Sequence, residues 1–140
     1  MTSPAPVMFV HITDTHILPS PEARYHGVDT AATLRRVVAE VVELETRPAF
    51  ALVSGDLTDG GEPEAYARLA GILQPLRAAG MPVLHALGNH DNRPAFWATI
   101  LGRSYQPPER HRHAVEVGGL RLIVLDSLIE GEIDGEVGDD

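Results

Sequence analysis

The sequence predicts an α/β fold, in which three strand–helix pairs form a parallel sheet and a β-hairpin follows. Three observations predict it. Short apolar, β-branched runs alternate with longer amphipathic stretches as far as Gly102, a pattern typical of parallel strands joined by helices. The order then changes, and two apolar runs flank Gly118-Gly119, a two-residue hairpin signal. Hydrophobic residues make up 44% of the 140 residues, enough for the core of one domain over residues 1–140.

The three expected strands are the apolar runs at residues 7–12, 50–54 and 82–87. Each run is short and is bounded by polar or turn-forming residues, as expected for a buried strand. His11 and His85 interrupt the first and third runs. We interpret both as residues of the sheet face or of the core.

A helical stripe follows each strand. Asp29 or Thr30 can cap the first helix. The apolar positions of this helix recur at i, i+3, i+4 and i+7, which places them on one face: Leu34, Val37, Val38 and Val41. The third helix begins at residues 92–94, and Gly102 suits its C-terminal cap.

The second helix opens at Glu62-Pro63, where the missing N–H of proline costs no hydrogen bond. Its expected buried stripe is Tyr66, Leu69, Leu73 and Leu76. Pro75 should kink this helix or end it near that point, because proline cannot donate to the preceding turn.

The C-terminal part of the chain differs in composition. Residues 113–117 and 120–126 are the expected hairpin strands. Residues 130–140 hold six acidic residues and three glycines, so we expect a loosely held tail.

The charge of the chain excludes some functions. The net charge is −9, from 11 basic and 20 acidic residues. This balance disfavours a nucleic-acid duplex or an anionic membrane surface as partner, since both attract Lys and Arg. The chain has no cysteine, which excludes disulfides and thiolate zinc sites. With neither a secretory signal nor a membrane-spanning run in the sequence, we expect a cytoplasmic protein.

Three polar clusters follow the three expected strands. They are Asp14-Thr15-His16, the segment at residues 55–59, and Gly88-Asn89-His90-Asp91. The carboxyl ends of parallel strands meet at one edge of a sheet, where sites are built in such folds. Carboxylate, amide and imidazole donors without thiolates suit divalent metals used for hydrolysis.

The spacing of these residues fits a metal site. Asp14 and His16 are two residues apart and can reach one cation from a strand end. Asp56 has two carboxylate oxygens and can bridge two cations, which lie about 3.5–4 Å apart in typical two-metal sites. Asn89 offers an amide oxygen to the second cation.

Two further residues of the clusters suit the chemistry beside the metals. His90, next to Asn89, can donate a proton to a leaving oxygen of the substrate. Asp59, three residues after Asp56, can hold the ring of His90 in orientation. Each cluster alone also has a plainer interpretation, as a strand ending in a turn or as a helix cap. Turn chemistry alone does not account for three clusters in this order.

At these residues the sequence resembles the calcineurin-like metallophosphoesterase family, and within it the branch of bacterial cyclic-nucleotide phosphodiesterases and glycerophosphodiesterases. The residues that carry the resemblance are 12–16, 25–30, 54–61, 87–93 and 125–127. The similarity extends from residue 7 to residue 138, nearly the whole chain. The three metal motifs are specific to the superfamily and much less specific for substrate.

The resemblance implies an αββα sandwich, of which this chain is the N-terminal part, and a site with two divalent metals, Mn, Fe or Zn. It implies that Asp14, His16, Asp56 and Asn89 bind the metals, and that His90 contacts the phosphate or assists the leaving group with Asp59 as partner. A metal-bound hydroxide is then the nucleophile. Arg93 either contacts a substrate phosphate or is a solvated residue at a helix start. His26 lies where it can line the substrate mouth.

The sequence departs from the family in one respect. Family members supply further ligands from a later His and a Gly-His-x-His motif, and this chain has neither. His111-Arg112-His113 has ligand-like spacing but opens a strand, so it is a poor substitute. We therefore expect one metal, or weakly bound metal, in a chain truncated at the C-terminus. Loss of the second lobe would expose apolar surface, which favours a homodimer.

Two functions from different classes follow. The first is a phosphodiesterase that acts on small phosphodiesters, with 3′,5′-cyclic nucleotides preferred and glycerophosphodiesters next. The alternative is an incomplete, non-catalytic fragment that self-associates. A phosphoprotein phosphatase is disfavoured because Gly60-Gly61, rather than Arg-Gly, follows Asp59. The DNA-processing nucleases of the superfamily are disfavoured by the net charge of −9.

Overall fold

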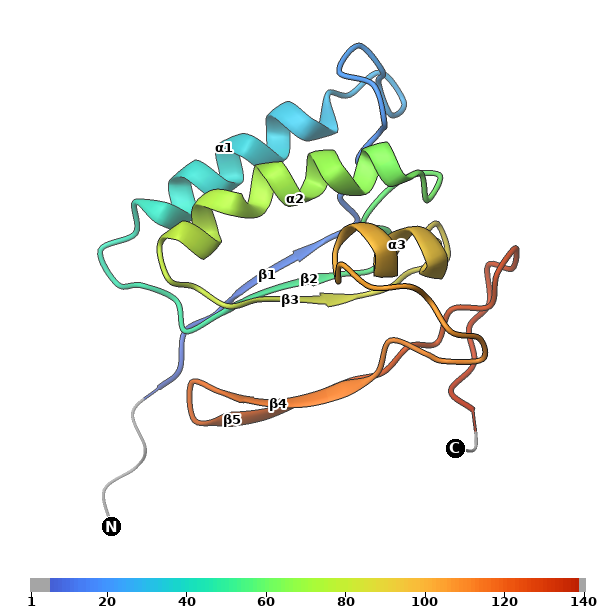
Figure 1. Cartoon of the computed structure of the whole chain (residues 1–140). Coiled ribbons are helices and arrows are strands. Elements are labelled where there is room, and N and C mark those ends of the chain that lie inside the picture. The colour runs from blue at the N-terminus through green and yellow to red at the C-terminus, as the bar shows by residue number, and fades with distance from the viewer. Residues whose placement is uncertain (1–5, 139–140) are drawn as a thin grey trace.

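The computed structural model describes residues 6–138 as a layered α/β arrangement (Figure 1). Three short strands, β1 (Val10–Thr13), β2 (Ala51–Ser54) and β3 (Val83–Ala86), form a parallel sheet in the order β1-β2-β3. Thr13 pairs with Ser54, and Ser54 pairs with Ala86. The carboxyl ends of all three strands therefore lie level at one edge of the sheet, as the sequence predicts.

Two long helices cover one face of this sheet, α1 (Thr30–Val42) and α2 (Pro63–Ala78), and they lie side by side in Figure 1. The carboxylate of Asp29 caps α1 by accepting a hydrogen bond from the amide of Ala32 at 2.9 Å. The faces predicted to be apolar are buried against the sheet, apart from Val37, which is 37% exposed.

Pro75 lies inside α2, which continues three residues further, to Ala78. Proline has no N–H to donate to the carbonyl of Gly71, and the helix ends within one turn of Pro75, as the sequence predicts. The carbonyl of Pro75 accepts a hydrogen bond from the amide of Ala79, and this bond closes the helix.

The short helix α3 (Arg93–Thr99) follows β3 and is capped by the side chain of Asn92, which accepts a hydrogen bond from the amide of Ala95. Its C-cap is Ile100, two residues before Gly102, whose φ of 67° lies in the left-handed region. The chain then runs to the hairpin.

The predicted hairpin is present as β4 (His113–Val117) and β5 (Leu120–Val124), paired antiparallel. Gly118 and Gly119 have φ values of 59° and 78°, the left-handed pair that a tight hairpin turn requires. Figure 1 shows the hairpin on the side of the parallel sheet opposite α1 and α2. The α/β class with strand–helix alternation followed by a hairpin is confirmed.

Several large apolar side chains remain exposed around the hairpin and after it. Ile123 is 67% exposed and Leu125 is 52% exposed. This surface agrees with the expectation that apolar area lies open, while self-association stays a prediction. Within residues 6–138, no helix is long and apolar enough to cross a bilayer.

Residues 130–138 fold back on the preceding segment. The amide of Glu136 donates to the carbonyl of Ser127 at 2.9 Å, and Leu128 and Gly135 form an isolated bridge. The tail predicted to be loose ends at residues 139 and 140, which lie outside the described residues. A loose tail over residues 130–140 stays a prediction.

Candidate metal centre

The loops after β1 and β2 remain paired beyond the ends of their strands. The amide of Asp14 donates to the carbonyl of Gly55 at 3.2 Å, and the amide of His16 donates to the carbonyl of Asp56 at 3.0 Å. Ile17 and Thr58 then form a parallel bridge. This continued pairing holds the first two polar clusters of the sequence side by side.

The backbone at these clusters is unusual. Asp14, His16 and Asp56 have φ values of 55°, 39° and 45°, in the left-handed region that non-glycine residues seldom adopt. Such conformations cost roughly 1–3 kcal/mol each and persist where the surrounding structure enforces them, typically at functional sites. Here the cross-loop hydrogen bonds do so.

A glycine allows the third cluster to approach the second. A Cβ atom added to Gly88 would lie 2.2 Å from the amide nitrogen of Asp56 and 2.3 Å from its Oδ1. No side chain fits there, so Gly88 lets the loop after β3 lie against the loop after β2.

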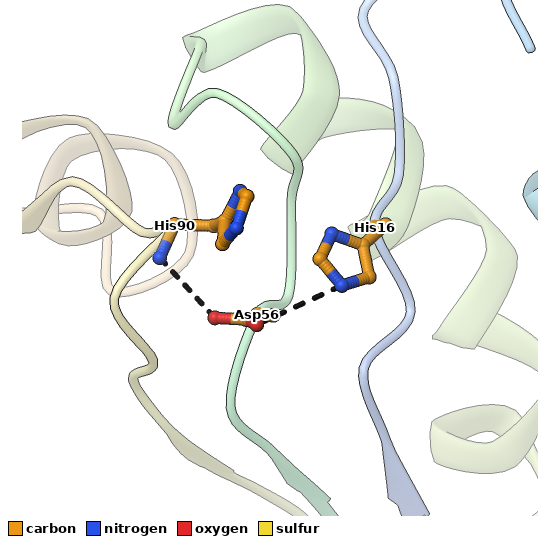
Figure 2. A group of neighbouring side chains, drawn as sticks. All are labelled: His16, Asp56 and His90. Carbon is orange, nitrogen blue, oxygen red and sulfur yellow. Dashed lines mark hydrogen bonds and ion pairs between the residues drawn. The ribbon is translucent and has the colours of Figure 1, made fainter. Parts of the chain in front are cut away.

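His16, Asp56 and His90 form a group whose potential ligand atoms all lie within 4.8 Å of one another. Figure 2 shows the carboxylate of Asp56 between the two histidines. Oδ2 of Asp56 lies 3.6 Å from Nε2 of His16, and Oδ1 accepts a hydrogen bond from the backbone amide of His90 at 3.2 Å. His16 is buried and His90 is half-buried.

Asp59 contacts both imidazole rings. Its carboxylate Oδ1 lies 3.2 Å from Nδ1 of His16, and its backbone carbonyl lies 2.7 Å from Nδ1 of His90. A carbonyl and an ionised carboxylate only accept hydrogen bonds, so each Nδ1 carries the proton. Nε2 of each ring then keeps its lone pair, the form in which imidazole binds a metal.

This donor set fits a divalent cation. It offers two imidazole rings whose Nδ1 atoms contact Asp59 and one carboxylate, which suits borderline metals such as Zn, Mn or Fe. The bond to the carbonyl of Asp59 is also the largest cause of a raised pKa at His90, with the charges of Asp56, Asp59 and Asp91 adding to it against the effect of desolvation.

The other predicted ligands are Asp14, which is not part of this group, and the amide of Asn89. Asp14 is exposed, and its carboxylate accepts a hydrogen bond from the hydroxyl of Thr13. Asn89 is exposed and adjoins His90. The predicted partnership of Asp59 with His90 runs mainly through the carbonyl of Asp59, while its carboxylate lies 3.4 Å from Nδ1 of His90, further than from His16.

Arg93 is not the solvated residue at a helix start that one interpretation of the sequence allowed, because it is only 7% exposed. Nε and Nη2 each donate to the carboxylate of Asp126 at 2.8 Å, and Nη2 also donates to the carbonyl of Leu128. The bidentate pair joins the start of α3 to the segment after β5 and gives Arg93 a structural partner. A contact of Arg93 with a substrate phosphate stays a prediction.

Tyr25 is a neighbour of the site that the sequence did not single out. Its ring stacks on His16, with centroids 4.2 Å apart and planes 8° from parallel. Tyr25 and Val28 exchange two backbone hydrogen bonds across His26 and Gly27, a tight turn that fixes the ring. His26 is exposed and contacts Tyr25 edge-on, so its predicted place at the substrate mouth stays a prediction. In the sequence, Tyr25 belongs to the segment 25–30 that carries part of the family resemblance, but no role was assigned to it.

A second network that the sequence did not reveal lies beneath the site. Asp91 is 6% exposed and accepts hydrogen bonds from the amides of Leu57, Thr58 and Gly88 and from the hydroxyl of Tyr66. Burial raises the pKa of Asp91 and, together with the charge of Asp91, that of Tyr66. From the sequence, Asp91 had only the plain interpretation of a helix-capping residue, because it directly precedes the third helix.

The remaining histidines lie elsewhere. Nε2 of His11 bonds the hydroxyl of Ser54 across β1 and β2 at 2.6 Å. His85 is 5% exposed, which confirms its expected place in the core, and His111 reaches the carbonyl of His85 at 3.1 Å. Among the described residues, the metal-compatible group of His, Asp and Glu side chains includes neither His111 nor His113.

Comparison with known families matches residues 7–139 to the family described as calcineurin-like phosphoesterase. A probable cyclic nucleotide phosphodiesterase of Rhodococcus erythropolis is 39% identical over 140 aligned residues, which cover 97% of this chain and 45% of that protein. A cAMP/cGMP dual specificity phosphodiesterase of Mycobacterium tuberculosis is 33% identical over 93% of this chain and 41% of its own length.

A glycerophosphodiester phosphodiesterase of Enterobacter lignolyticus is 31% identical, over 92% of this chain and 46% of its own length. The chain therefore spans less than half the length of these three relatives. The family match over residues 7–139 of this chain contains all three polar clusters.

Proposed function

Because the chain belongs to the calcineurin-like phosphoesterase family, we propose that it acts as a metal-dependent phosphodiesterase with 3′,5′-cyclic nucleotides as substrates. The observation that carries this proposal is the group of His16, Asp56 and His90, in which both imidazoles have Nδ1 engaged by Asp59. This arrangement leaves the Nε2 lone pair of His16 beside the carboxylate of Asp56, which suits a cation, and brings the ring of His90 next to that pair.

We assign His16 and Asp56 as ligands to a first divalent cation, with Asp14 completing its set. Asp56 and Asn89 are the proposed contacts to a second cation, which this chain alone would hold weakly because they supply only two ligand residues. A bound divalent cation supplies Lewis-acid polarisation of the phosphoryl oxygen and makes water a stronger nucleophile at neutral pH.

His90 is the proposed catalytic residue of this chain. Its Nδ1 is held by the carbonyl of Asp59 at 2.7 Å, so its Nε2 is the ring atom left to meet substrate. A protonated Nε2 donates to a phosphate oxygen or to the leaving oxygen as the phosphoester bond breaks.

The substrate class rests on similarity. Relatives named as cyclic nucleotide phosphodiesterases match most of this chain, and glycerophosphodiesters are the next candidate through the Enterobacter relative. His26 is the proposed contact at the substrate mouth. A cytoplasmic location, a homodimer, and the choice among Mn, Fe and Zn stay predictions.

Hydrolysis assays with Mn²⁺ test the proposal, with bis(p-nitrophenyl) phosphate, cyclic AMP and a glycerophosphodiester as parallel substrates. Asp56→Asn is the control, since it removes one charge at the group and keeps the size of the side chain. Metal-dependent hydrolysis that is lost in Asp56→Asn supports a working site, and a preference for cyclic AMP supports the substrate class. A folded chain with no more activity than Asp56→Asn would favour the non-catalytic alternative.

A further inference from the structure

The carboxylate of Asp91 lies buried between the two loops that carry Asp56 and His90. The loops follow neighbouring strands, β2 and β3, and run side by side in Figure 1. Asp91 is 6% exposed, although a buried carboxylate is costly unless it is well hydrogen-bonded.

The hydrogen bonds of Asp91 reach both loops. Oδ2 accepts from the amide of Leu57 at 3.1 Å in the loop after β2 and from the amide of Gly88 at 2.9 Å in its own loop. Oδ1 accepts from the amide of Thr58 at 3.2 Å. One side chain therefore holds three backbone amides, two of which directly follow Asp56 in the sequence.

The helix α2 adds a third point of attachment. The hydroxyl of Tyr66 donates to Oδ1 of Asp91 at 2.8 Å and accepts from the amide of Asn92 at 2.9 Å. Tyr66 is fully buried, so this attachment joins the site loops to the rigid core.

We propose that Asp91 is a positioning residue, which fixes the separation of Asp56 and His90 and thereby sets the affinity of the site for a divalent cation. This inference rests on the proposed function for the metal, but the loop geometry it describes exists without metal. The two loops are closely packed, because the backbone of Gly88 lies against Asp56 with no room for even a methyl group. A small shift of either loop would therefore displace a ligand.

Asp91→Asn tests the proposal with little change in side-chain shape. The asparagine amide has only one acceptor oxygen. If its NH₂ group replaces Oδ2, it faces the backbone N–H groups of Leu57 and Gly88; if it replaces Oδ1, it faces the N–H of Thr58. At least one of these amides loses its acceptor. We expect hydrogen exchange of the affected amides in the metal-free protein to become about tenfold faster or more. The dissociation constant for Mn²⁺ should rise about ten- to a hundredfold.

Leu69→Ala is the matched control, since it truncates a fully buried residue of α2 whose side chain takes no part in these hydrogen bonds. It should lower the melting temperature without the local change in exchange or the loss of Mn²⁺ affinity. If folded Asp91→Asn binds Mn²⁺ as wild type does, or loses affinity no more than Leu69→Ala, the positioning role is wrong.

Tyr66→Phe provides a milder variant in case Asp91→Asn does not fold. It removes one donor to Asp91 and should speed exchange at Thr58 and weaken Mn²⁺ binding by a smaller factor; no change in either would overturn the proposal. A wild-type chain that binds no Mn²⁺ would refute the proposed function. In that case unchanged amide exchange in Asp91→Asn would separately refute the positioning role.

Discussion

The carboxylate of Asp59 lies 3.2 Å from Nδ1 of His16, closer than to the ring of His90 at 3.4 Å. Asp59 thus orients the buried histidine with its side chain and the half-buried one with its backbone carbonyl. A single residue sets the tautomer of both imidazoles, and the two contacts can be separated by mutation because only one of them depends on the side chain.

Asp59→Asn should weaken metal binding through His16 alone. The neutral amide no longer enforces the Nδ1–H tautomer, while the carbonyl contact to His90 remains. We expect the dissociation constant for Mn²⁺, measured by calorimetry, to rise by about tenfold or more. Glu116→Gln, which removes one charge from the exposed face of the hairpin, is the control and should leave it unchanged. Equal behaviour of the two variants would contradict the role given to Asp59.

His90→Ala separates the catalytic assignment of His90 from a ligand role. If His90 acts on the substrate, metal bound by His16, Asp56 and Asp14 persists while turnover falls by about a hundredfold or more, the typical contribution of a positioned acid. Metal content and rate measured on one preparation decide this. Loss of the metal together with the rate would instead make His90 a third ligand, an outcome that the geometry of Figure 2 also permits.

Arg93→Ala should destabilise the fold. It leaves the carboxylate of Asp126, whose side chain is fully buried, without its bidentate partner. Breaking such a pair typically costs about 3–5 kcal/mol of unfolding free energy. Denaturant titration measures it, with Arg121→Ala as control because its pair with Glu116 is exposed and should matter little. A small loss for Arg93→Ala would show that the pair does not hold α3 to the segment after β5.

The stability of the fold should fall as the pH drops below about 6.5. Burial, with the nearby charges of Arg77, His111 and His113, lowers the pKa of His85 from 6.5 to about 3. Burial also lowers the pKa of His111. Between these values His85 binds a proton in the unfolded chain and not in the folded one, so this group favours unfolding on acidification, while the raised pKa values of His90 and Asp91 act in the opposite direction.

Thermal unfolding between pH 7.5 and pH 4 measures this effect, and His85→Leu should flatten the profile because it removes the histidine whose pKa is lowered to about 3. An unchanged pH profile in His85→Leu would show that other groups govern the acid response.

The sequence was sufficient for the element order and for the clustering of the three motifs, because each strand is an apolar run and parallel strands place their carboxyl ends at one edge. It could not foresee that Arg93 is buried, since its partner Asp126 lies 33 residues away. The stacking of Tyr25 on His16 and the buried bonds of Asp91 likewise depend on how loops pack, which no periodicity records. Local residue types predicted the candidate metal ligands, and tertiary contacts decide which of these side chains lie together.

The most direct test of the central claim is Mn²⁺ binding followed by electron paramagnetic resonance, which detects coupling to ligand nitrogens, in wild type and in Asp56→Asn. A metal centre at His16 and Asp56 predicts bound Mn²⁺ with histidine nitrogen coupling in the wild type, and loss of most of that binding in Asp56→Asn. Binding without nitrogen coupling, or binding that Asp56→Asn leaves intact, would contradict a metal centre at this edge of the sheet.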